Sequence, residues 1–204
     1  MLVRDCMTHK PITIRPESDP MAAISLLTAG KFRHLPVIES DGSLAGIVDR
    51  ADLELFLAKA GSPGYVKRNH RVDQVMQRAV VTVRPDCPLE EAATLMVQHK
   101  IGSLPVLEDG KLVGIITETD IFKRFAAILG GGSDSLRLTV QLDDRPGQLA
   151  ELAGRIARVN GNIVSVVSSP AGQPGRMTFT LRVEGVDLSS LRAAVEDQPG
   201  LVIL

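Results

Sequence analysis

The chain has 204 residues, of which 44% are hydrophobic and only 3% aromatic, so its core must consist mainly of aliphatic side chains. The 23 basic and 24 acidic residues nearly balance, which gives no general drive toward nucleic acid or an anionic membrane. No apolar run is long enough to span a bilayer, and the only two cysteines lie far apart, which favours neither a disulfide framework nor a zinc site. We expect a soluble, cytoplasmic protein without nucleic-acid or membrane partners.

The N-terminal part of the chain carries an internal repeat. Leu35-Pro36-Val37 recurs 69 residues later as Leu104-Pro105-Val106. Beyond the Asp-Gly turn that follows, matching residues recur at a spacing of 68, because ESDGSLAG in the first copy is EDGKLVG in the second. A turn is where a hairpin tolerates such a change in length, so we interpret the pattern as two copies of one unit.

Each copy begins with a short extended segment, ITIRP or VVTVRP. A helix follows, which should begin at Pro20 in the first copy and at Pro88 in the second, and end at Gly30 or Gly102. The next residues predict a β-hairpin closed by the Asp-Gly turn. The sequence thus predicts a small mixed α/β unit, twice.

A second helix should start at residues 51–52 in the first copy and 118–119 in the second. We place the first copy at residues 1–68 and the second at residues 69–129. The basic run at residues 65–71, between the copies, is typical of a solvated linker. A unit of this size with one half-covered sheet is marginal alone, so the two copies should pack together.

The stretch GGGSDS, residues 130–135, is typical of a flexible linker. Residues 136–204 then predict a strand, a helix, two strands, a helix and a closing strand. This βαββαβ order is typical of an antiparallel four-stranded sheet with both helices on one face, the ferredoxin-like plan. The predicted fold class is therefore α/β (α+β) throughout.

The tandem copies, VRDCMT…LPVIESDGSLAGIVDRADL and VDQVMQ…LPVLEDGKLVGIITETDI, resemble a pair of CBS domains. The segment DDRPGQLAELAGRIARVNGNI resembles an ACT domain, and the CBS–CBS–ACT order is similar to the AcuB-type acetoin-utilisation family. The resemblance implies ligand-binding regulatory modules. CBS pairs commonly bind adenosine-containing molecules, and ACT domains commonly bind amino acids at an interface between paired domains.

In GIITETDIF, Thr117 and Asp120 stand where a buried strand runs into a helix. A helix N-terminus favours an anion, a threonine hydroxyl can donate to a phosphate, and an aspartate can accept both hydrogen bonds of a ribose diol. The CBS resemblance implies the same roles for these two residues. The alternative is a capping box, in which the two side chains only hold the start of the helix.

The first copy reads GIVDRADL, with Asp49 where the second copy has Thr117. Aspartate caps a helix equally well, but its charge repels a phosphate. Because Asp52 is retained, a nucleoside without a nearby phosphate remains an alternative there. Arg33 either offsets Asp49 or is a solvated surface residue. We predict two unequal sites, with the stronger at Thr117 and Asp120.

By resemblance, the base of the ligand should lie against backbone and apolar groups of the packed pair. The segment after the first methionine should close the stronger site from across the pair. Within it, Lys10 either reaches a phosphate or is simply exposed. The residues nominated for this site, beyond Thr117 and Asp120, are Ile115, Ile116, Ser103, Leu104, Thr8, Lys10, Pro11 and Ile12.

In the C-terminal segment, Gly147 would let backbone approach a ligand, and the helix that follows would offer N–H groups to a carboxylate. Asn162 would accept an ammonium group. The alternative is ordinary turn and helix-capping chemistry. The residues nominated for this amino-acid site are Asp144, Arg145, Pro146, Gly147, Gln148, Leu149 and Asn162.

No nucleophile–base pair, metal-ligand spacing or phosphate-binding loop stands out, so we predict a protein that is not an enzyme and requires no cofactor. The predicted function is a regulatory sensor of AMP, ADP, ATP or S-adenosylmethionine. Its ACT segment would form a homodimer and offer an amino-acid site, and the sensor would act on an unidentified regulated protein. The alternative is a scaffold whose ligand sites are vestigial.

Overall fold

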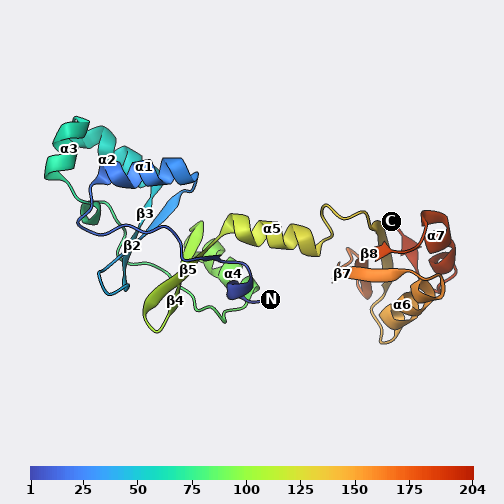
Figure 1. The fold of residues 1–204 in the computed structure, drawn as a ribbon. Helices are drawn as coiled ribbons and strands as arrows, with labels where there is room; N and C mark the ends of the chain where they lie inside the picture. Colours follow the sequence, from blue (N-terminus) through green and yellow to red (C-terminus); the bar gives the residue numbers. More distant parts are fainter. The chain divides into compact units, whose positions relative to one another are not determined.

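The computed structural model describes residues 1–204, apart from the side chain of Arg68. The chain forms two compact units, Met1–Phe122 and Lys123–Leu204 (Figure 1). None of the described helices is long and apolar enough to cross a bilayer. The helices are α1 Pro20–Gly30, α2 Arg50–Ala60, α3 Pro63–Asn69, α4 Leu89–His99, α5 Glu118–Ile128, α6 Gln148–Arg158 and α7 Leu188–Glu196. The strands are β1 Thr8–His9, β2 His34–Ile38, β3 Leu44–Asp49, β4 Ser103–Glu108, β5 Lys111–Thr117, β6 Leu136–Asp143, β7 Asn162–Pro170, β8 Arg176–Glu184 and β9 Val202–Ile203.

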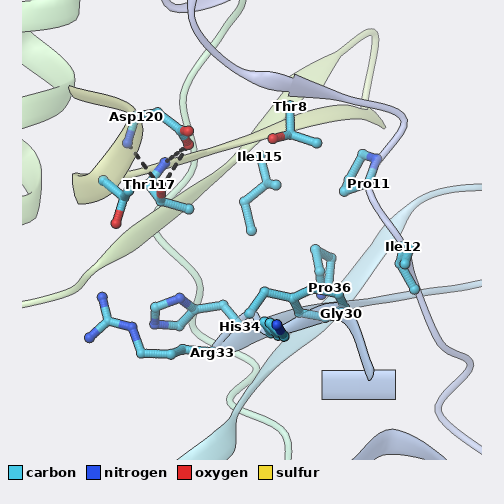
Figure 2. A pocket seen from close by; sticks show the side chains of 13 residues that line it. Thr8, Pro11, Ile12, Gly30, Arg33, His34, Pro36, Ile115, Thr117 and Asp120 are labelled. Carbon is cyan, nitrogen blue, oxygen red and sulfur yellow. Dashed lines mark hydrogen bonds between the residues drawn. The ribbon is translucent and has the colours of Figure 1, made fainter. Parts of the chain in front are cut away.

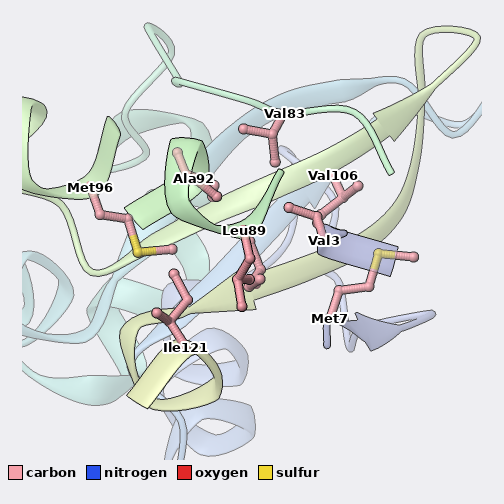
Figure 3. Close-up of a cluster of buried hydrophobic side chains, with 10 residues drawn as sticks. Val3, Met7, Val83, Leu89, Ala92, Met96, Val106 and Ile121 are labelled. Atoms are coloured by element: carbon pink, nitrogen blue, oxygen red, sulfur yellow. The ribbon is translucent and has the colours of Figure 1, made fainter. Parts of the chain in front are cut away.

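The two copies in the first unit exchange their N-terminal segments. The core of the second copy, around α4 and the sheet β1-β5-β4, contains Val3 and Met7 from the start of the chain (Figure 3). The core of the first copy, around α1 and the hairpin β2-β3, contains Val72 and Met76 from the second copy. Each copy therefore completes the hydrophobic core of the other, which explains why units of this size occur as a pair.

The repeated glycines Gly46 and Gly114 lie where the exchanged segments cross the hairpins. A Cβ on Gly46 would lie 2.6 Å from the backbone oxygen of Gln77, and one on Gly114 would lie 3.1 Å from that of Thr8. Strand β1 pairs directly with β5 at this point, with His9 opposite Gly114. The glycine recurs in both copies because a side chain there would push the two backbones apart.

The first helix of each copy forms close to its predicted bounds. Helix α1 spans the predicted residues. Helix α4 starts directly after Pro88, which is its N-cap, and ends at His99 because Lys100 adopts a left-handed φ of 54°. Gly102, the glycine expected to close this helix, lies three residues beyond its last residue. The extended segment before each of these helices forms one isolated parallel bridge to the hairpin and no strand.

The basic run at residues 65–71 is mostly exposed, as predicted, but residues 65–69 are helical and do not form a loop. Helix α3 occupies Pro63–Asn69, with a proline in its first turn, where the missing N–H costs no hydrogen bond. Val66 is 1% exposed and anchors the helix. The basic composition of this run gave no indication that Val66 is buried.

The second unit has the predicted order β6-α6-β7-β8-α7-β9 and a sheet with strand order β7-β8-β6-β9. All of its strand pairs are antiparallel. Leu152 and Ile156 of α6 and Leu191 and Val195 of α7 share one core with alternate residues of the sheet. Both helices therefore cover the same face, which confirms the ferredoxin-like plan.

The two ends of the glycine-rich stretch 130–135 are hydrogen-bonded to the sheet of the second unit. The guanidinium of Arg182 on β8 donates to the backbone oxygens of Leu129, at 3.1 Å, and Ser135, at 3.3 Å. Ser165 on β7 donates to the backbone oxygen of Ile128, at the end of α5. The end of α5 and the residues after it are thus tied to two strands of the sheet.

Candidate functional site

Two cavities lie between the copies of the first unit. The larger one, which we name cavity 1, has a volume of about 450 Å³ (Figure 2). One wall is the β5–α5 junction of the second copy, and the other walls come from the first copy. The lining residues are Thr8, Pro11, Ile12, Gly30, Lys31, Phe32, Arg33, His34, Pro36, Ile115, Thr117, Thr119 and Asp120.

The smaller one, cavity 2, has a volume of about 270 Å³. One wall is the β3–α2 junction of the first copy, and most of the remaining lining comes from the second copy. The lining residues are His34, Ile47, Asp49, Asp52, Gln77, Ala79, Val80, Val81, Lys100, Ile101, Gly102 and Ser103. At repeat-equivalent positions, Asp49 replaces Thr117, Gly102 replaces Arg33 and Gln77 replaces Thr8. The cavities are therefore two versions of one site.

Thr117 and Asp120 form a complete capping box at the start of α5. The backbone N–H and the hydroxyl of Thr117 donate to Oδ2 of Asp120, at 3.0 and 2.7 Å, and the N–H of Asp120 donates to the threonine hydroxyl oxygen at 3.3 Å (Figure 2). None of the described residues donates to Oδ1 of Asp120. The cap thus leaves one carboxylate oxygen free to accept from a ligand.

Two cations of the first copy line cavity 1. Arg33 is partly paired with Glu118 through an Nη2–Oε2 distance of 3.6 Å. Both side chains are well exposed, so this pair adds little stability and leaves the guanidinium accessible. Lys31 follows α1 in a left-handed conformation, with φ of 54°. Cavity 1 therefore combines a helix N-terminus with two cations, which suits an anionic group.

The structure places several nominated residues elsewhere. Leu104 and Ile116 have 0% exposure and belong to the core of the second copy, so they do not line cavity 1. Ser103 lines cavity 2, and Arg33, nominated for the weaker site, lines cavity 1. Lys10 lines neither cavity. Each cavity is formed by the strand–helix junction of one copy and the first hairpin strand of the other copy. Ser103 begins the first hairpin strand of the second copy and therefore lines cavity 2, and Arg33 directly precedes that of the first copy and therefore lines cavity 1.

The remaining nominated residues of the stronger site lie together as expected. Thr8, Pro11 and Ile12 line cavity 1 together with Ile115, which is the strand partner of Thr8 in the β1–β5 pair (Figure 2). Sequence reasoning missed further lining residues, because their repeat positions carry no polar motif. They are Gly30, Lys31, Phe32, His34, Pro36 and Thr119.

In cavity 2, both carboxylates are already hydrogen-bonded. Asp49 accepts from the N–H of Ala51 at 2.7 Å, which confirms that an aspartate caps this helix, and Gln77 donates to Asp52 at 2.9 Å. Nε2 of His34 lies 3.2 Å from Oδ2 of Asp49. Burial lowers the pKa of His34 below its ordinary value, and the nearby Asp49 opposes this shift. The lowered pKa favours the neutral imidazole, which does not cancel the charge of Asp49.

The residues nominated in the second unit surround the start of α6 and of β7. Gly147 caps α6 with a left-handed φ of 91°, and Arg145 is paired with Asp143 at 2.5 Å. The N–H of Asp144 donates to the backbone oxygen of Gly175 at 2.9 Å. Among the described residues these positions line neither cavity 1 nor cavity 2, and an amino-acid site here stays a prediction. The others in this group are Pro146, Gln148, Leu149 and Asn162.

The family of the chain follows from direct comparison. The CBS domain family matches residues 3–59 and 72–127, and the TTHA0829-like ACT domain family matches residues 131–203. The chain therefore belongs to the CBS-domain family, as a tandem CBS pair followed by an ACT domain.

Several proteins are similar in sequence to the CBS pair of this chain. A CBS domain-containing protein of Dictyostelium discoideum is 33% identical over 136 residues, which cover 63% of this chain and 94% of the relative. L-aspartate semialdehyde sulfurtransferase of Methanocaldococcus jannaschii is 30% identical over 125 residues, covering 61% of this chain but only 23% of the enzyme. The resemblance to that enzyme is confined to a minor part of its length and carries no activity to this chain.

Solved structures of CBS pairs are similar in the same region. AcuB from Vibrio cholerae has a TM-score of 0.58 and 32% identity, covering 64% of this chain and 93% of that one. The CBS pair of protein MJ0100, solved with 5′-methylthioadenosine and S-adenosyl-L-methionine, has a TM-score of 0.55 and 30% identity, covering 62% and 97%. CBSX2, solved with AMP, has a TM-score of 0.54 and 33% identity, covering 62% and 97%.

Proposed function

We propose that this protein is a non-catalytic regulatory sensor that binds an adenine nucleotide in cavity 1. The observation that carries the proposal is the β5–α5 junction, where the capping box leaves one oxygen of Asp120 free beside the hydroxyl of Thr117. Similar CBS pairs hold AMP or adenosyl compounds, which supports the same ligand class here. AMP, ADP, ATP and S-adenosylmethionine are the candidates to test.

In this proposal each part of the nucleotide meets a different wall. The ribose diol donates to Asp120, because a carboxylate accepts two hydrogen bonds from vicinal hydroxyls. The phosphate lies near Thr117 and the start of α5, where N–H groups and the helix dipole favour an anion, and it faces the cations Lys31 and Arg33. The adenine packs against the apolar part of the lining, which includes Pro11, Ile12, Pro36 and Ile115.

Thermal melting with each candidate nucleotide tests the proposal. Ligand at a hundred times its dissociation constant stabilises the protein by about 2.7 kcal/mol, which shifts the melting of the CBS pair by several degrees. Asp120→Ala should abolish the shift caused by AMP, ADP or ATP, while the matched variant Asp52→Ala, in cavity 2, should retain it. If no candidate shifts the melting, or if Asp120→Ala responds to these three nucleotides like the wild type, the sensor function is wrong and the scaffold alternative is favoured.

We further propose that the ACT domain joins two copies of the chain. Strand β7 is an edge strand of its sheet, and Val164 and Val166 on it are 46% and 42% exposed. An exposed edge with apolar side chains is a template for pairing with another sheet. Light scattering should give twice the monomer mass, and Val166→Lys should shift the protein toward monomer. A wild-type protein that remains monomeric at high concentration would contradict this.

The loop from Asp144 to Leu149 is the proposed place for an amino-acid ligand in the same domain. The space beside Gly147 is open, because a Cβ built on this residue would have no atom within 4 Å. The twenty amino acids belong in the same melting screen as the nucleotides. A regulated partner protein would then bind differently according to which ligands occupy the two domains.

A further inference from the structure

The two cavities differ in charge at matching positions. Cavity 1 is lined by two cations, Lys31 and Arg33, and one carboxylate, Asp120. Cavity 2 is lined by one cation, Lys100, and two carboxylates, Asp49 and Asp52.

Two substitutions between the repeats produce this difference. Asp49 stands where cavity 1 has Thr117, and Gly102 stands where it has Arg33. The first adds a negative charge at the place where a 5′ substituent would meet the helix start. The second leaves this wall without a cation of its own: the guanidinium beside Gly102 is that of Arg33, with Nη2 3.4 Å from a Cβ built there, and it is paired with Glu118.

The carboxylate of Asp49 is held in place at the helix start. The N–H of Ala51 and the ring of His34 both contact it, at 2.7 and 3.2 Å. His34 reaches it from the opposite strand, because His34 and Asp49 are directly paired in the β2–β3 hairpin. The side chain is therefore not free to turn away from a phosphate, and a mostly neutral imidazole does not cancel its charge.

The features for a nucleoside remain in cavity 2. Asp52 occupies the position of the diol acceptor, and only its Oδ2 accepts from the described residues, through Gln77. Ile47, Val80, Val81 and Ile101 supply apolar surface for a base. Its volume of about 270 Å³, against about 450 Å³ for cavity 1, also suits the smaller ligand.

We propose that cavity 2 binds an adenosine compound without a phosphate, neutral or cationic at its 5′ position, so that the protein reads two adenosine ligands of different charge. The proposal rests on the adenosine-binding function proposed above. A phosphate in cavity 2 would lie against the carboxylate of Asp49, whereas a thioether or hydroxyl would not be repelled and a sulfonium would be attracted.

Calorimetric titration of the full chain with adenosine, S-adenosylmethionine and AMP tests the proposal. Asp120→Ala disables cavity 1 and leaves cavity 2 to be measured by itself, and an unliganded melting curve establishes that the variant is folded. In this variant, adenosine and S-adenosylmethionine should bind at least about tenfold more tightly than AMP. Equal or tighter binding of AMP would overturn the proposal.

The matched gain-of-function variant adds Asp49→Thr to Asp120→Ala. It gives cavity 2 the residue of its twin, and threonine is also an N-cap, so the helix start is kept. The affinity for AMP should rise about tenfold, and that for adenosine should stay within about threefold. An unchanged ratio of the two affinities would overturn the role of Asp49.

The two proposals fail in distinguishable ways. If the wild type binds AMP through Asp120 but Asp120→Ala binds no adenosine compound, only the present inference is wrong. If neither protein binds any of the three probes, the sensor function itself is wrong. Loss of adenosine binding to Asp120→Ala when Asp52→Ala is added would place the measured ligand in cavity 2.

Discussion

At the scale of single residues, the two helix-start motifs show how one position serves folding and binding together. Thr117 and Asp49 each cap their helix, through different hydrogen bonds. Capping alone therefore does not explain why the copies differ. Thr117 is neutral and Asp49 is negative. The residue on the facing wall is the cation Arg33 in cavity 1 and the uncharged Gly102 in cavity 2. The divergence of the repeat is thus consistent with two ligands rather than with decay of one site.

His34 lies at the boundary of both cavities and makes stability depend on pH. Because burial lowers its pKa below 6.5, the unfolded chain takes up a proton at a pH where the folded chain does not. Its contribution to the free energy of unfolding is present above pH 6.5 and is lost as the pH falls through the lower pKa of the folded state. The charge of Arg33 also lowers the pKa of His34, whereas the charges of Asp49 and Glu118 raise it.

Melting between about pH 7.5 and about pH 5 measures this effect. The wild type should lose more stability on acidification than His34→Gln, which keeps a hydrogen-bond donor beside Asp49 but does not titrate. The shared titration of other groups cancels in the comparison. Equal losses in the two proteins would show that His34 does not contribute.

At the scale of elements, the sequence predicted the hairpins, the other helices and the βαββαβ order, but neither α3 nor the exchange between copies. The glycine and Asp-Gly signals located the hairpins and α1, and the βαββαβ order of the second unit was confirmed. The exchange of the N-terminal segments, which contain Val3 and Val72, was not predictable. The two copies are so similar in sequence that each segment would fit the core of either copy. Arg33 and Ser103 were assigned to the wrong cavities for that reason.

The glycine-rich stretch after α5 gives a prediction at this scale. Gly130 has a φ of 75°, and a Cβ there would lie 2.6 Å from Cγ of Arg182. Gly130→Ala should therefore destabilise the second unit by about 1–2 kcal/mol, through backbone strain and displacement of Arg182. Gly154→Ala is the matched control, because that helical glycine has no neighbour within 4 Å and alanine favours a helix. A freely flexible linker would instead tolerate both substitutions alike.

At the scale of the whole molecule, the chain joins a CBS pair to an ACT domain through α5, which begins at the capping box and ends tied to the ACT sheet. A ligand changes the behaviour of such a chain only if it binds one state better than another. In the proposed function, the nucleotide binds at the start of α5. This makes the Thr117 and Asp120 site central to the proposed function.

The most direct test exchanges the decisive residue of cavity 1 for that of its twin. Titration of Asp52→Ala, in which cavity 2 is disabled, should give one site for AMP. Adding Thr117→Asp, which still caps the helix, should weaken AMP at least about tenfold and change the affinity for adenosine by less than about threefold. If AMP binds the two proteins equally well, the nucleotide phosphate does not lie at the start of α5 and the proposed site is wrong.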